Sequence, residues 1–121
     1  MKNFHDLERF AEHYNFVVTS TTGGKHNRGS KHALGLAVDV RTRGKENTEV
    51  EAFIGKARRL GIIVHDERTK PRHQKVWSGA HLHLEIGAGT LATVREFQKL
   101  NNLTVDRIVG SLTLAALDSL F

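Results

Sequence analysis

The chain has 121 residues, an ordinary hydrophobic content and a net charge of +5. These values allow one compact domain with a modest core and exclude an intrinsically disordered chain. The absence of cysteine excludes disulfides and thiolate metal sites, so any metal would be held by histidine and carboxylate side chains.

The N-terminus contains no apolar run of the kind found in a signal peptide, and no apolar stretch approaches the roughly 20 residues that span a bilayer. We therefore expect a soluble chain made in the cytosol, without a membrane partner. The positive charge suits an anionic partner, although it also favours simple solubility.

The first elements in chain order are a helix and a short strand. Apolar residues recur at three- and four-residue steps over 3–13, which predicts an amphipathic helix that Asn3 can cap. The β-branched run 16–20 predicts a strand. The glycine-containing segment 21–31 predicts a polar loop, and its spacing does not match a phosphate-binding loop.

A second strand is predicted over 34–40, with Asp39 on the face opposite its apolar residues. The next helix should begin at Thr48, which forms a capping box with Glu51, and should end at Gly61.

Two more strands are predicted, over 62–64 and 81–86, separated by a polar loop over 66–74. The second of these alternates strictly, so that three polar side chains share the face away from the core: His81, His83 and Glu85.

The C-terminal part is predicted to be helical. Thr90 can cap a helix that extends to Leu100, and a second short helix starts at Ser111 or Thr113 and ends near Leu120. The element order predicts an α+β fold with a small antiparallel β-sheet and flanking helices.

Histidine and aspartate near these strands suit a zinc ion, for which three protein ligands and one open position are typical of a catalytic site. We take His32, Asp39 and His83 as the metal ligands on the sheet face. His81 is then the general base or a transition-state donor, and Glu85 is a partner that orients an imidazole. The opposite assignment, with His81 as ligand and His83 as helper, remains open. We treat the other histidines as surface residues: His5, His13, His65 and His73.

The motif S-x-H-x-x-G-x-A-x-D at residues 30–39 resembles the signature of the D-alanyl-D-alanine carboxypeptidase family of zinc peptidases. That family shares a fold group with lysostaphin-type peptidases and the hedgehog signalling domain. The segment HLHLE at residues 81–85 resembles the His-x-His strand of the same group.

This resemblance implies one Zn²⁺ ion on His32, Asp39 and His83, assistance from His81, and a bacterial cell-wall peptide as substrate. Members also use an arginine upstream of the motif, for which Arg28 is the candidate.

The chain departs from the family at one position. Many members carry Glu or Asp three residues before the last ligand as general base, where this chain has Ala80. The base is therefore expected to be His81, or a carboxylate from a loop such as Asp66 or Glu67.

Residues 94–117 resemble the latter half of a peptidoglycan-binding module. Arg107 stands where that module usually has glycine, which is expected to strain the turn. We predict a peptidase domain over 1–89 and a two-helix segment over 90–121; the alternative is that these helices simply pack on the sheet.

These patterns together predict a monomeric, zinc-dependent peptidase that cuts peptidoglycan stem peptides, as a D,D-carboxypeptidase or an endopeptidase. The alternative is a metal-stabilised cell-wall-binding domain without catalysis. Nucleic-acid binding is disfavoured because basic and aromatic residues do not alternate. The protein would act on the wall after release or export, or on wall peptides in the cytosol.

Overall fold

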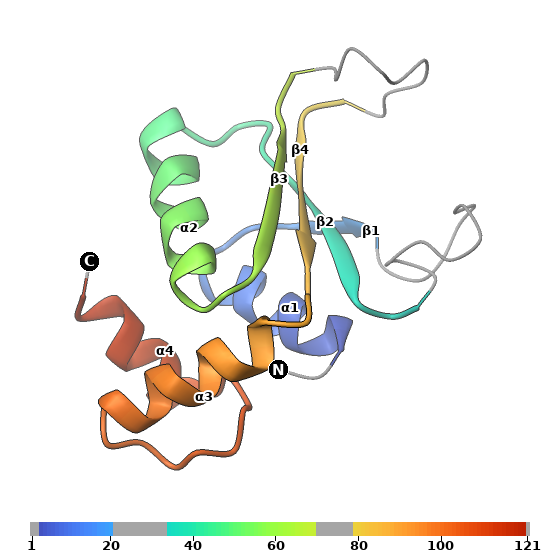
Figure 1. Cartoon of the computed structure of the whole chain (residues 1–121). Helices are drawn as coiled ribbons and strands as arrows, with labels where there is room; N and C mark the ends of the chain where they lie inside the picture. Colours follow the sequence, from blue (N-terminus) through green and yellow to red (C-terminus); the bar gives the residue numbers. More distant parts are fainter. Residues whose placement is uncertain (1–2, 21–33, 70–78, 121) are drawn as a thin grey trace.

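The computed structural model describes residues 3–20, 34–69 and 79–120. In these ranges a small antiparallel sheet is combined with helices, which confirms the predicted α+β class (Figure 1). The elements, in chain order, are α1 (Phe4–His13), β1 (Val18–Ser20), β2 (Ala37–Arg41), α2 (Asn47–Arg59), β3 (Ile63–Glu67), β4 (His81–Glu85), α3 (Thr90–Leu100) and α4 (Ser111–Asp118).

The described strands form one sheet in the order β1-β2-β4-β3, and each neighbouring pair is antiparallel. Strands β2 and β4 therefore lie in the centre, although some forty residues separate them in the chain. This topology brings the two sequence motifs side by side.

One face of the sheet is buried beneath α1 and α2. The Phe53 ring of α2 lies 4.1 Å from that of Phe16 and 5.3 Å from that of Phe10, measured between centroids. These rings share a core with the inward residues of the strands: Val38, Val40, Val64, Leu82 and Leu84. The opposite face carries no helix in the part of the chain that the structure describes (Figure 1).

Helix α1 begins as predicted, because Asn3 and Asp6 form a reciprocal capping box. The predicted capping box of α2 is wrong. The helix begins at Asn47, after Glu46, whose carbonyl accepts the hydrogen bond from Val50 N. Thr48 therefore lies within the first turn, where its hydroxyl does not act as the cap.

Gly61 ends α2, as predicted. It has a φ of +76°, and the backbone N–H groups of Gly61 and Ile62 donate to the carbonyls of Arg58 and Ala57. This is the Schellman arrangement, which satisfies carbonyls at the end of a helix. A Cβ at position 61 would also lie 2.6 Å from Thr93 Cβ, so glycine permits close packing of this turn against α3.

The predicted strand boundaries need correction. Strands β1 and β2 begin later than expected, and β3 continues to Glu67 instead of ending at residue 64. The prediction that Asp66 and Glu67 belong to a loop is wrong, because they pair with Leu82 and His81 of β4. Polar residues at consecutive positions concealed this part of the strand.

Helices α3 and α4 lie beyond one end of the sheet and share its core through Val94, Phe97 and Leu117 (Figure 1). The prediction that Thr90 caps α3 is wrong: Gly89 occupies the cap position, and Thr90 is buried. The Thr90 hydroxyl accepts from Gly87 N at 2.9 Å and donates to the Gly61 carbonyl at 2.7 Å. It therefore ties α3 to the end of α2.

Among the described residues, none of the helices combines the length and the apolar character that crossing a bilayer requires.

Candidate functional site

The open face of the sheet carries a grid of side chains from three paired strands. Residues that are directly opposite each other in an antiparallel pair point to the same face. The register places Asp39, His83 and His65 in one row across β2, β4 and β3. The rows on either side are Arg41, His81 and Glu67, and Ala37, Glu85 and Ile63.

Asp39 and His83 lie together at the centre of this grid. The Asp39 Oδ1 atom is 3.1 Å from His83 Nδ1, and about a fifth or less of each side chain is exposed. The alternation of both strands causes this contact, because it turns the two polar side chains away from the core that the intervening apolar residues form.

The other nitrogen of His83 faces a second carboxylate. His83 Nε2 is 2.8 Å from Glu85 Oε1, and the same oxygen is 3.6 Å from His65 Nε2. Burial alone would lower the pKa of His83, but the hydrogen bonds to Asp39 and Glu85 outweigh it and raise that pKa above its usual value. Both ring nitrogens of His83 therefore face anionic ligand atoms.

His81 forms a separate pair with Glu67. Its Nδ1 atom donates to the Gly79 carbonyl at 2.7 Å, and its Nε2 atom lies 2.6 Å from Glu67 Oε2. Gly79 has a φ of +105°, a conformation that glycine adopts readily. The Nδ1 contact fixes the ring, so that the Nε2 atom faces the Glu67 carboxylate on the open face.

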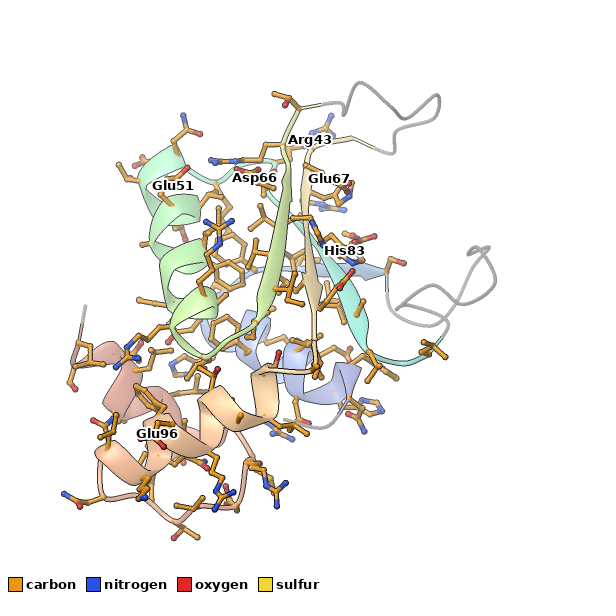
Figure 2. The ribbon with its side chains drawn as sticks, viewed as in Figure 1. Arg43, Glu51, Asp66, Glu67, His83 and Glu96 are labelled. Atoms are coloured by element: carbon orange, nitrogen blue, oxygen red, sulfur yellow. The ribbon has the colours of Figure 1, made fainter. Side chains whose placement is uncertain are left out.

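Asp66, the other acidic residue considered as a base, points to the opposite face. Arg68 donates to its carboxylate at 2.6 and 2.8 Å and also contacts Glu51 of α2. The hydrogen bond from Arg68 lowers the pKa of Asp66. Figure 2 shows Asp66 on the side of β3 near Glu51, whereas Glu67 and His83 lie on the other side.

The structure thus brings four predicted site residues onto one surface: Asp39, His81, His83 and Glu85. His32 and Arg28, predicted as metal ligand and substrate-binding residue, lie outside the described residues. Sequence reasoning missed His65, which it treated as a surface residue. The two-residue spacing of His65 and Glu67 places both side chains on one face of a strand. It would have indicated this face if the predicted strand had been continued to residue 67.

The donors on this face fit a divalent cation. His65, His83 and Glu85 offer ligand atoms that all lie within 4.8 Å of one another. Around a tetrahedral zinc, ligand atoms lie about 3.3 Å apart, so modest side-chain movement would close this set. Asp39 and Glu67 place two further carboxylates on this face. If the imidazoles are neutral, the grid of side chains has a net negative charge, although the whole chain has a net positive charge.

Within the C-terminal segment, the buried side chain of Gln98 organises the connection between α3 and α4. Its Nε2 atom donates to Asp106 Oδ1, the Ile108 carbonyl and Thr113 Oγ1 at 3.0–3.1 Å, and its Oε1 atom accepts from Arg107 N. Arg107 has a φ of +62°, which agrees with the expected strain at this position.

A cavity of about 260 Å³ lies beside this connection, and Gln98 and Thr113 contribute to its wall. Leu112 and Ile108 also line it, and they are 73% and 41% exposed. The cavity therefore presents both apolar side chains and hydrogen-bonding groups.

Comparison with known proteins gives one finding on the C-terminal part. Residues 84–117 match the family described as a peptidoglycan binding domain, which supports the predicted resemblance of this segment. The chain matches no curated protein and no solved structure. The match begins within β4 and leaves the preceding residues unassigned, so the resemblance to zinc peptidases stays a prediction.

Proposed function

We propose that this protein is a zinc-dependent peptidase that hydrolyses peptidoglycan stem peptides. The observation that carries the proposal is the contact between Asp39 and His83 across the two central strands, with the His81–Glu67 pair in the next row. A metal-ligand pair and a proton-transfer pair then share one open surface.

In this proposal Asp39 and His83 hold the ion together with His32. His83 would bind through Nδ1, and Glu85 would accept the Nε2 proton, which orients the ring. Zinc on such a site supplies Lewis-acid polarisation of a peptide carbonyl and acidifies a water molecule.

The His81–Glu67 pair handles the proton in the proposed reaction. As general base, the pair accepts a proton from the attacking water; as general acid, it then donates a proton to the leaving amine. Glu67 orients His81 and balances the positive charge that develops on its ring. The pair would thus serve as the general base, a role for which the chain has no carboxylate at Ala80.

The C-terminal similarity supports peptidoglycan as the substrate. A segment similar to a peptidoglycan binding domain would keep the sheet close to the polymer. Stem peptides carry free carboxylates, which suit a chain with a net charge of +5.

The proposal is tested by incubating purified peptidoglycan with zinc-loaded protein and with chelator-treated protein. Soluble peptide fragments that appear only with zinc are the expected result. Their masses identify the bond that is cut and separate a carboxypeptidase from an endopeptidase.

The second candidate is a cell-wall-binding domain without catalysis, which the C-terminal match and the cavity beside Gln98 favour. Its test is sedimentation with insoluble peptidoglycan. Binding without any soluble product would support it. Leu112→Asp, which places a charge at the exposed cavity wall, should then reduce the sedimented fraction, whereas Leu100→Asp on the exposed end of α3 serves as control.

A further inference from the structure

The side chain of His83 lies between two sets of ligand atoms. Its Nδ1 atom faces Asp39 at 3.1 Å, and its Nε2 atom faces Glu85 at 2.8 Å. His65 completes the second set, because its Nε2 atom is 3.6 Å from the same Glu85 oxygen and its ring centroid is 5.4 Å from that of His83.

We propose that His65, His83 and Glu85 form an alternative divalent-cation site that overlaps the Asp39 site at His83. Two imidazoles and one carboxylate are a set that zinc accepts, and imidazole also suits nickel and copper. The 2.8 and 3.6 Å separations are close to the spacing of about 3.3 Å around a tetrahedral ion.

The two positions exclude each other. A neutral imidazole has one nitrogen with a free lone pair and one that carries a proton. His83 therefore binds an ion through Nδ1, beside Asp39, or through Nε2, beside His65 and Glu85. The chain would hold one ion in either of two positions rather than two ions at once.

The second position has a consequence that rests on the proposed function. An ion held by His65, Glu85 and His83 Nε2 leaves a proton on His83 Nδ1, so His83 and Asp39 cannot bind an ion together. The same ion also takes up the Glu85 carboxylate that would orient His83. Metal bound there would not support hydrolysis.

Zinc binding to the full chain, without substrate, tests the inference. Competition with a chromophoric chelator should give one zinc per chain for the wild type, Asp39→Ala and His65→Ala. The double variant Asp39→Ala/His65→Ala should bind zinc much more weakly than Asp39→Ala does. Loss of an outer-shell partner lowers metal affinity by roughly 10–100-fold, and the loss in the double variant should exceed this range. Asp39→Ala/His13→Ala is the matched control and should still bind, because His13 lies on α1 and pairs with Asp118.

Two outcomes would overturn the inference: a folded Asp39→Ala that binds no zinc, or a double variant that binds as tightly as Asp39→Ala. Where Asp39→Ala fails to fold, Asp39→Asn replaces it. In that variant, zinc should shift the ¹⁵N resonance of His65 Nε2, and an unchanged His65 resonance would also refute the site. These readouts do not involve hydrolysis, so they stand apart from failure of the proposed peptidase activity.

Discussion

Glu67 of β3 and His81 of β4 face each other in register, with Glu67 Oε2 2.6 Å from His81 Nε2. The pair lies one row from Asp39 and His83 on the same face of the sheet. An imidazole–carboxylate pair from two different strands thus lies beside the proposed metal ligands Asp39 and His83.

Glu67→Gln should lower the turnover of a peptide substrate by about 100-fold or more, because the amide cannot balance the charge of a protonated His81. Zinc affinity and KM should change little, and the pH dependence of kcat should shift. Steady-state kinetics with a defined stem peptide measure these values. Asp66→Asn is the control: this neighbour points to the other face, so the rate should stay at the wild-type value. Equal losses in both variants would argue against the His81–Glu67 pair.

Arg107→Gly should raise the free energy of unfolding by about 0.5–1 kcal/mol, because Arg107 holds a φ of +62° that glycine adopts without strain. Urea denaturation measures the change. Arg107→Ala removes the same charge but keeps the Cβ, so it should give no such gain. A gain of equal size in the alanine variant would show that charge, rather than backbone strain, is responsible.

Gln98→Ala should lower the free energy of unfolding by about 1–3 kcal/mol, because the buried Thr113 hydroxyl and the backbone groups of Ile108 and Arg107 lose their hydrogen bonds to this side chain. Gln98→Glu has nearly the same shape but cannot donate to the Ile108 carbonyl, and it places a charge beside Asp106. It should therefore be at least as damaging. Urea denaturation of both variants is the measurement, and a loss below about 0.5 kcal/mol would contradict the organising role of Gln98.

Asp118 should make stability depend on pH in the acid range. Burial would raise its pKa, but hydrogen bonds from Tyr14 and His13 outweigh this and lower it. A carboxyl whose pKa is lower in the folded state stabilises the fold above its unfolded pKa of about 4, and this contribution is lost as the pH falls through the folded value. Solvent screening keeps it below about 1 kcal/mol, since the side chain is 41% exposed.

Thermal unfolding of the wild type and Asp118→Asn between pH 2 and pH 7 measures this contribution. The difference between the two proteins should be largest near neutral pH and should vanish in strong acid. A difference that stays constant over this range would mean that Asp118 acts by shape and not by charge.

Sequence patterns located β4 well, because this strand alternates strictly between apolar and polar residues. Its open-face residues, His81, His83 and Glu85, follow directly from that period. Strand β3 was harder, since His65, Asp66 and Glu67 are all polar and the apolar alternation stops at Val64. Only pairing with β4 shows that His65 and Glu67 share the site face.

Contacts between residues that lie far apart in the chain could not be predicted from the sequence either. Thr90 resembles a helix cap, but its hydroxyl bonds to the Gly61 carbonyl, a partner that lies far away in the chain. Similarly, the number of residues between Asp39 and His83 does not indicate how close the two side chains lie in space. Their contact depends on the β2–β4 register, which the order of the elements alone does not define.

Mass spectrometry of soluble products from purified peptidoglycan tests the proposed activity most directly. Zinc-loaded wild-type protein should release peptide fragments with new termini, whereas chelator-treated protein and His83→Ala should release none. His83→Ala should also lose its zinc while remaining folded. Release of the same fragments at an undiminished rate by chelator-treated protein or by His83→Ala would contradict the zinc peptidase. Absence of fragments from the zinc-loaded wild type, together with sedimentation on the polymer, would favour a binding domain instead.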